Sequence, residues 1–364
     1  MRSVHRSFLP SAGFQHGVLH DVQACRAGRR WRCGRANYSG LSVAGGTLRW
    51  DTLFGIRRRE FLKTAAAGTL GVGASAADTL PRRRYRDNVE LSIIGFGGIL
   101  VVGLEQQEAN RLVAESVELG VNYFDVAPSY GDGEAEVKLG AALQPYRKQV
   151  FLACKTQQRD AAGARRELER SLERLRTDHF DLYQHHAVTT LEDVERIFAP
   201  GGAQELFLKA REEGKVRYLG FSAHSVAAAL AMLDRFPFDS VLFPINFVCY
   251  SQGNFGPQVV ARAREKGAAR LALKALAFTR WPKGTDRSKT ATPKTWYQPV
   301  TDEKLAEQAL RFTLSEDITA AIPPGDDKLY RLALRLAARF RPLSAEERKE
   351  LLARAAGVEP IFRA

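Results

Sequence analysis

Four side chains that can exchange or position protons stand at short intervals in the middle of the sequence. Asp125 and Tyr130 lie five residues apart in the segment YFDVAPSYG. Lys155 follows one apolar run, and His186 ends another. A phenol can donate a proton, and a nearby ammonium lowers its pKa from the usual value of about 10. The set therefore suits protonation of an oxygen as a carbonyl group becomes an alcohol.

Each of the four side chains has an expected part in this chemistry. Lys155 is expected to lower the pKa of Tyr130, and Asp125 to pair with Lys155 and fix its direction. His186 is expected to hydrogen-bond a substrate oxygen and orient it. None of these groups can supply a hydride, so the reaction needs a cofactor that carries one. Taken singly, each residue also has a purely structural explanation, and only the combination indicates chemistry.

Eight short apolar runs alternate with amphipathic stretches from residue 88 onward. The runs are 93–97, 121–125, 150–155, 180–185, 216–220, 240–245, 270–275 and 318–322. The amphipathic stretches lie near 105–119, 134–143, 160–176, 191–213, 225–234, 256–266, 302–315 and 326–339. Leu168, Leu172 and Leu175, for example, fall on one helical face. Eight strand–helix units predict an α/β fold of the (β/α)8 type, the TIM barrel.

The barrel prediction also predicts where the four side chains meet. An open doubly wound sheet is the alternative, but that fold carries a G-x-G-x-x-G fingerprint, which the run GFGG at 95–98 does not complete. In a barrel the chemistry lies at the C-terminal ends of the strands. Asp125, Lys155 and His186 are expected to end the second, third and fourth strands, with Tyr130 in the loop beyond. They would then converge on one rim.

Further polar residues and one long segment belong to the same rim. Ser222 follows the fifth run, Asn246 follows the sixth, and Lys274 lies in the seventh. The unpatterned segment 278–301 comes after the seventh run, and a long loop there favours a lid or a substrate wall over a linker. Its aromatic residues are Trp281, Trp296 and Tyr297.

Residues 88–340 resemble the aldo-keto reductase family. The resemblance rests on the spacing from Asp125 to Tyr130, on Lys155 at a strand end, and on the run DLYQHH at 181–186. In the family the histidine lies five residues after such an aspartate, which selects His186 over His185. Strand alternation places those two on opposite faces. The resemblance implies a barrel, Tyr130 as general acid, and a nicotinamide cofactor, usually NADPH, bound without a Rossmann domain. The substrate would be a small carbonyl compound or alcohol.

The resemblance also implies a set of cofactor contacts. The run GFS at 220–222 resembles the segment whose serine and next residue hold the carboxamide, but the next residue, commonly Asn, is Ala223 here. The run IPPG at 322–325 resembles a phosphate-binding segment. Asp326 and Asp327 stand where members that prefer NADPH often have Arg or Lys, so NADP(H) is the first expectation and NAD(H) the alternative. The expected contacts are Gly97, Ser222, Asn246, Lys274, Gly325 and Lys328.

Two functions of other classes stay open at this point. A Schiff-base lyase on the same barrel would use Lys155 or Lys274 as nucleophile, and borohydride would trap its covalent adduct. Neither lysine shows in the sequence the apolar isolation that would depress its pKa. A non-catalytic regulatory subunit would bind the nicotinamide cofactor with negligible turnover. Such a subunit has no need of all four acid–base residues.

Composition and charge exclude several classes. The chain has 364 residues, of which 45% are hydrophobic and 26% charged, as is usual for a globular protein. No apolar run of about 18 residues occurs, so no membrane span is expected. The four cysteines form no C-x-x-C pair, and no metal site is expected. Residues 1–77 hold 12 Lys/Arg and 3 Asp/Glu, so they carry nine of the thirteen net positive charges. Nucleic acid is therefore not an expected partner.

The N-terminal part of the chain predicts a targeting signal. Residues 57–77 hold RRREFLK, a weakly apolar stretch and the run ASA, which is the layout of an export signal of the twin-arginine type. Use of that machinery would place the protein in the periplasm or outside the cell, and a non-functional signal would leave it cytoplasmic. Residues 1–56 form an atypical extension, and one hypothesis is that translation starts near residue 50. Native peptides from residues 1–40 would contradict it. The barrel and a C-terminal segment are expected over 78–364.

Overall fold

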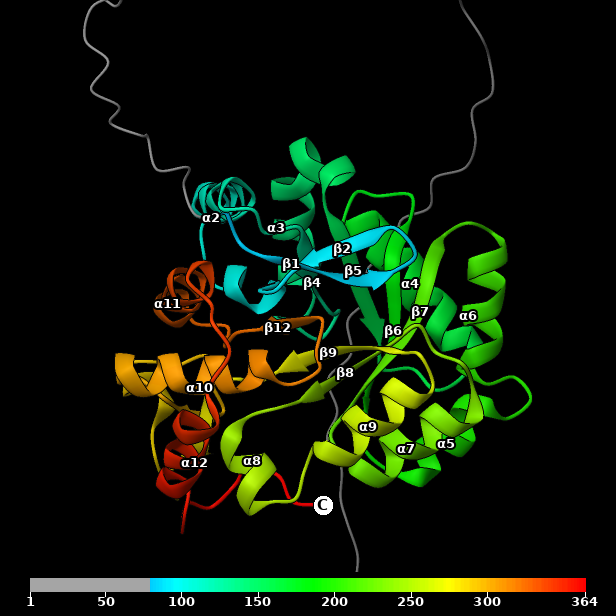
Figure 1. Ribbon diagram of the computed structural model, residues 1–364. Coiled ribbons are helices and arrows are strands. Elements are labelled where there is room, and N and C mark those ends of the chain that lie inside the picture. Colours follow the sequence, from blue (N-terminus) through cyan, green and yellow to red (C-terminus); the bar gives the residue numbers. More distant parts are fainter. Residues whose placement is uncertain (1–78) are drawn as a thin grey trace, which may run out of the picture. The chain divides into compact units, whose positions relative to one another are not determined.

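The computed structural model describes residues 79–364 (Figure 1). The predicted extension at 1–56 and the predicted signal at 57–77 lie outside the described residues. Eight parallel strands form the central sheet, in the spatial order β12-β9-β8-β7-β6-β5-β4-β3. They are β3 (Phe96–Gly97), β4 (Tyr123–Asp125), β5 (Phe151–Thr156), β6 (Phe180–Val188), β7 (Val216–Ala223), β8 (Ser240–Pro244), β9 (Ala269–Leu273) and β12 (Ala320–Ile322).

The first and last strands of this sheet meet and bring it nearly to closure. The amide of Gly95 donates to the carbonyl oxygen of Ala321 at 2.9 Å, and the amide of Ala321 donates to the carbonyl oxygen of Ile93 at 2.9 Å. Ile94 and Ala321 form a parallel bridge between these hydrogen bonds. The predicted (β/α)8 barrel is confirmed, and each of the eight apolar runs overlaps one of its strands.

Helices surround the strands at the predicted places. They are α2 (Gln106–Glu118), α3 (Glu134–Leu143), α4 (Ala161–Arg174), α5 (Leu191–Phe198), α6 (Ala203–Glu212), α7 (Val226–Arg235), α9 (Pro257–Glu265), α10 (Glu303–Ser315) and α11 (Asp327–Ala338). The single amphipathic stretch at 191–213 is two helices. Gly201 has φ +76°, and a β-carbon on Gly202 would lie 2.3 Å from the carbonyl oxygen of Ile197, so the chain turns there. None of the described helices has the length and apolar content that a bilayer crossing needs.

Two antiparallel pairs of strands were not predicted. β1 (Arg82–Arg86) pairs with β2 (Val89–Ser92), and Tyr85 of this hairpin packs on Phe151 and Tyr218, with ring centroids 5.0 and 5.3 Å away. Phe151 begins β5 and Tyr218 lies near the start of β7, so the hairpin covers the N-terminal end of the barrel. The opposite end of the barrel, at the C-terminal ends of the strands, is not covered by this hairpin and can hold an active site.

The second pair lies in the segment expected to be an unpatterned loop. β10 (Ala277–Arg280) pairs with β11 (Tyr297–Pro299). The indole nitrogen of Trp281 donates to the carbonyl oxygen of Thr295 at 3.0 Å, and Tyr297 is buried. Trp281 therefore holds the two ends of this segment together, and Tyr297 packs it against the core of the barrel.

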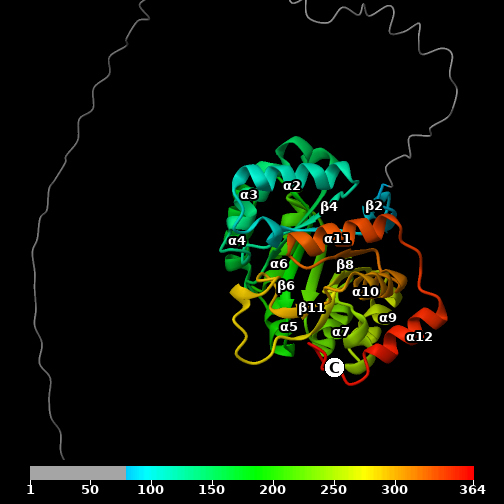
Figure 2. The same ribbon diagram turned by 90° about the vertical axis from the view of Figure 1, so that its left-hand side faces the viewer.

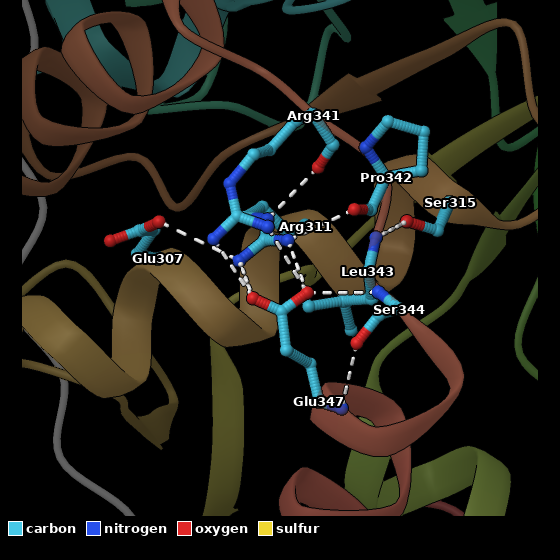
Figure 3. Close-up of polar contacts among 8 residues, drawn as sticks. All are labelled: Glu307, Arg311, Ser315, Arg341, Pro342, Leu343, Ser344 and Glu347. Atoms are coloured by element: carbon cyan, nitrogen blue, oxygen red, sulfur yellow. Dashed lines mark hydrogen bonds and ion pairs between the residues drawn. The ribbon is translucent and has the colours of Figure 1, made fainter.

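Two helices lie outside the eightfold repeat, α8 (Phe247–Gln252) and α12 (Ala345–Arg354). Helix α10 packs against both α11 and α12 (Figure 2). Arg311 of α10 donates to the carbonyl oxygens of Arg341 and Pro342, each at 2.9 Å, and to both carboxylate oxygens of Glu347 at 2.9 and 2.6 Å (Figure 3). These hydrogen bonds from Arg311, and then those from Arg341, hold the pKa of Glu347 well below its usual range. One buried guanidinium thus fixes the C-terminal helix.

We expect Arg311→Met to lower the melting temperature by roughly 4–10 °C, because two carbonyl oxygens lose their donor and Glu347 loses one of its two guanidinium partners. Thermal unfolding followed by circular dichroism measures the change. Arg335→Met is the matched control, since Arg335 is exposed on α11 and reaches Glu303 only at 3.8 Å. Equal melting temperatures for the two variants would contradict the assignment of a stabilising role to Arg311.

Candidate active site

Asp125, Lys155 and Tyr130 come together at the C-terminal ends of β4 and β5. The ammonium of Lys155 forms an ion pair with Asp125 Oδ1 and donates to the Tyr130 hydroxyl at 3.3 Å and to the Val126 carbonyl oxygen at 3.2 Å. Lys155 is 1% exposed and Asp125 is 2% exposed. Charges this deeply buried must be paired, and this pair fixes the position of the ammonium beside the phenol.

The strand register explains why these side chains meet. Asp125 pairs with Ala153 across β4 and β5, and Ala153 belongs to the cluster of side chains inside the barrel. Since side chains two residues apart share a face, Lys155 also points inward. Cys154 lies in the other core, between the sheet and the helices.

A fifth residue of this cluster was missed in the sequence. Gln184 pairs with Lys155 in the register of β5 and β6, and its amide nitrogen donates to Asp125 Oδ2 at 2.9 Å. Gln184 is fully buried. The sequence did contain a signal for Gln184. Side chains two residues apart on a strand share a face, and Gln184 stands two residues before His186.

Burial changes the proton affinities of this cluster. Burial is the largest influence on Tyr130 and raises its pKa, while Lys155 lowers it and Asp125 raises it again. The expectation that Lys155 brings the pKa of Tyr130 below its usual value is therefore wrong for the free site, since burial outweighs the ammonium. For Lys155 itself burial opposes the charge, but Asp125 and Tyr130 raise its pKa above the usual value. The lysine keeps its proton, and so does the tyrosine.

His186 stands beside Tyr130, and its neighbour His185 does not. The imidazole of His186 meets the phenol ring edge-on, with centroids 6.0 Å apart and planes at 86°. His185 stacks on Phe207 at 3.8 Å and contacts Gln204 through Nε2 at 3.0 Å, on the helix side of the sheet. This placement agrees with the choice of His186 made from strand alternation.

A break in the strand register holds His186 in place. The pairing of β6 with β7 shifts between His185 and Val188, and Ala187 has φ +52°. The guanidinium of Arg159 donates to the carbonyl oxygens of His186 at 2.9 Å and Ala187 at 3.2 Å. A bulge of this kind re-aims a side chain next to a site.

We expect His186 to stay neutral between about pH 5 and 8. Burial, and then the charge of Lys155, lowers its pKa well below the usual value. Nitrogen-detected NMR of the imidazole rings, with His186→Gln to assign the signal, measures this. A titration of His186 near its ordinary value would contradict the electrostatic description of the site.

Two of the expected cofactor residues form a polar end to β7 and β8. Ser222 Oγ accepts from the amide of Ala187 at 2.8 Å. Asn246 caps α8, since its Oδ1 accepts from the amide of Cys249 at 2.9 Å. Its Nδ2 is buried and has no hydrogen-bond partner within residues 79–364. A fixed, buried amide donor without an acceptor suits an oxygen such as that of a carboxamide.

The two expected glycines lie where the backbone is closely approached. A β-carbon on Gly325 would lie 2.0 Å from Ile99 Cγ2, and one on Gly97 would lie 3.1 Å from Ile322 Cγ2. Side chains are therefore excluded at Gly325 and tightly restricted at Gly97. Gly325 is partly exposed just before the N-terminus of α11, which is a place where an anion can bind.

The two carboxylates at the start of α11 are already engaged. Asp326 accepts from the amide of Leu329 at 3.2 Å and caps the helix. Asp327 pairs with Arg331 at 3.0 Å. Lys328 is exposed in the same turn and remains available to an anion.

Lys274 follows β9 in a left-handed conformation, with φ +64°. Its Nζ lies 3.4 Å from His224 Nε2 and 5.7 Å from the centroid of the Trp296 ring. Burial lowers the pKa of Lys274 to about 8. The expectation that neither lysine is isolated enough for a depressed pKa is therefore wrong for Lys274.

Similarity to known proteins agrees with this geometry. The model of the aldo/keto reductase family matches residues 94–353. The uncharacterized oxidoreductase YqkF of Bacillus subtilis is 26% identical over 300 residues, which cover 74% of this chain and 94% of that protein. The holo form of aldo-keto reductase AKR11C1 from Bacillus halodurans has a TM-score of 0.60 at 25% identity, over 78% of this chain and 100% of that one. An aldo-keto reductase from Klebsiella pneumoniae in complex with NADPH has a TM-score of 0.56 at 19% identity, over 76% of this chain and 94% of that one. Because the family match spans the barrel and well over half of the chain, the protein belongs to the aldo/keto reductase family.

Proposed function

We propose that this protein is an NAD(P)H-dependent oxidoreductase that reduces an aldehyde or ketone to an alcohol, or catalyses the reverse reaction, with Tyr130 as general acid. The observation that carries the proposal is the contact of the Tyr130 hydroxyl with Lys155 Nζ at 3.3 Å, where Lys155 is itself paired with buried Asp125. Family membership supports an oxidoreductase acting on carbonyl compounds.

Each residue of the cluster has a part in moving one proton. Tyr130 gives its proton to the carbonyl oxygen as that oxygen gains electron density. The ammonium of Lys155 then stabilises the phenolate that remains, since its own raised pKa keeps it charged. Asp125, held by Gln184, offsets the burial of that charge. Neutral His186 orients the carbonyl oxygen.

A nicotinamide cofactor supplies the hydride when it is bound. The free Nδ2 of Asn246 and the hydroxyl of Ser222 would hold its carboxamide. Gly97 at the end of β3 and Gly325 before α11 would contact its phosphates, with Lys328 near the N-terminus of α11. The Klebsiella relative in complex with NADPH supports NADPH as first choice.

We expect a higher kcat/KM with NADPH than with NADH, and we expect Lys328→Ala to reduce that preference about 10-fold, because a charge-assisted contact to the 2′-phosphate is lost. Steady-state assays with both cofactors measure it. Lys349→Ala, an exposed lysine on α12, is the control. Equal efficiencies with both cofactors, unchanged by Lys328→Ala, would point to no selection for the phosphate and would leave the reductase proposal itself intact.

The proposed function is tested directly with purified protein, either cofactor and a panel of aldehydes and ketones. Cofactor oxidation together with formation of the matching alcohol is the expected result. Cofactor binding without turnover of any substrate would favour a non-catalytic subunit. A borohydride-trapped adduct on Lys155 or Lys274 would favour the lyase.

A further inference from the structure

Lys274 is a positive charge that the proton chemistry does not use. Residues 79–364 place no carboxylate within ion-pair distance of its Nζ, and its one hydrogen-bond contact is the neutral ring of His224 at 3.4 Å. The pKa of His224 is lowered to about 3 by burial and then by Lys274, so the imidazole carries no charge. The left-handed backbone at Lys274 is uncommon for a residue with a β-carbon, and it aims this side chain at His224 and Trp296.

The charge of Lys274 acts electrostatically on the reacting groups. Lys274 lowers the pKa of His186, and Lys155 lowers the pKa of Lys274, so the three groups act on one another across the rim. Lys155 and Asp125 are buried, whereas four side chains of the rim keep partly exposed faces. These four are Tyr130, His186, His224 and Lys274.

Aromatic rings line one side of the ammonium. The ring of Trp296 lies 5.7 Å from Lys274 Nζ, and Phe362 stacks on His224 at 5.3 Å and meets Trp296 at 5.7 Å. Hydrogen bonds on either side of Phe362 in the sequence fix its position. The amide of Ala364 donates to the carbonyl oxygen of Gly253 at 2.9 Å, and Arg280 donates to the carbonyl oxygen of Ile361 at 2.8 Å. Apolar rings lower the local dielectric, so an anion beside Lys274 is bound more strongly than in water.

We propose that Lys274 anchors an anionic group of the substrate, and that the preferred substrates are carbonyl compounds that carry a carboxylate. This inference rests on the proposed reduction at Tyr130 and adds the substrate class. A partly buried ammonium that has no carboxylate partner in residues 79–364 gains charge-assisted hydrogen bonds from a substrate carboxylate. A cofactor phosphate is the other possible anion. The rings of Trp296 and Phe362 favour the substrate, since these residues come from the long segment after β9 and from the C-terminal segment rather than from the backbone around Gly325.

The test uses two aldehydes that differ only in charge, 4-carboxybenzaldehyde and its methyl ester. We expect Lys274→Met to raise KM for the carboxylate about 10- to 100-fold and to change KM for the ester far less. Lys274→Arg should restore most of the loss because it keeps the charge. Lys289→Met is the matched control, since Lys289 lies in the same long segment and its side chain is 83% exposed.

The pH dependence gives a second readout. A lysine with a pKa of about 8 is charged below that pH and neutral above it, so KM for the carboxylate should rise as the pH passes about 8. Four residues face Lys274. They are His224, which directly follows β7, Trp296, Cys249 of α8 and Lys155. Because the pKa of Cys249 is raised by burial and that of His224 is lowered, neither titrates in this window. KM for the ester should not change with it.

Binding experiments separate the possible outcomes. Calorimetric titration with 4-(hydroxymethyl)benzoate, with reduced cofactor present, tests the anchor without turnover, because neither compound can then accept a hydride from the other. A protein that reduces neither aldehyde would contradict the proposed function, and this binding experiment would still test the anchor. Unchanged binding of that carboxylate in Lys274→Met would overturn it. So would an equal loss for both aldehydes together with weaker NADPH binding, which would assign Lys274 to a cofactor phosphate. A borohydride-trapped adduct on Lys274 would make it a nucleophile instead.

Discussion

Replacing Tyr130 with phenylalanine is expected to lower kcat/KM for aldehyde reduction by about 10²- to 10⁴-fold, the usual contribution of a positioned general acid. The ring stays, so its edge-on contact with His186 is retained. What disappears is the hydroxyl that Lys155 contacts at 3.3 Å, and with it the only phenol proton beside that ammonium in the described part of the chain. Steady-state rates with saturating cofactor measure the loss.

Structure and cofactor binding should survive this substitution, which makes the loss specific to chemistry. Tyr146→Phe is the matched control, since Tyr146 is partly buried against the same core but lies away from the cluster. The pH profile adds a second check. Because burial raises the pKa of Tyr130, the alkaline loss of reduction in the wild type should lie above about 10, where a free phenol ionises. Undiminished turnover in Tyr130→Phe would end the proposed mechanism.

Much of the fold follows from local pattern, because hydrophobic period and strand–helix alternation are local properties. The eight apolar runs identify the eight barrel strands, and the helices between them are where amphipathicity places them. The hairpin of β1 and β2 was missed since its first strand, RRRYR, has one buried residue and is fixed only by packing on the barrel end. The pair of β10 and β11 was missed because 16 residues separate its strands and no tight turn marks it.

Some features of the site were also predictable from the sequence, and others were not. Asp125, Lys155 and His186 were accessible from the sequence because parallel strands bring their ends to one rim. The raised pKa of Tyr130 and the lowered pKa of Lys274 were not, since burial is contributed by segments far along the chain. Lys274 shows this most clearly, as its cover comes from Trp296 and the C-terminal Phe362.

Lys155→Met is expected to lower the free energy of unfolding by about 3–5 kcal/mol as well as to remove most activity, because it leaves Asp125 buried without its counter-charge. Asp125 is 2% exposed, and its remaining contacts are a hydrogen bond from Gln184 at 2.9 Å and one from Tyr123 at 3.4 Å. Two neutral donors do not replace an ammonium. Urea unfolding monitored by fluorescence and circular dichroism measures the change in stability.

The double variant Lys155→Met with Asp125→Asn separates the structural role of the pair from the chemical role of the lysine. Replacing both charges removes the uncompensated carboxylate, so the double variant should be more stable than Lys155→Met alone and the two effects should not add. Its activity should stay as low as that of Lys155→Met, because no cation then stabilises the phenolate of Tyr130. Additive losses of stability would mean that the ion pair contributes nothing to folding. Recovery of activity along with stability would mean that Lys155 serves the fold and not the proton transfer.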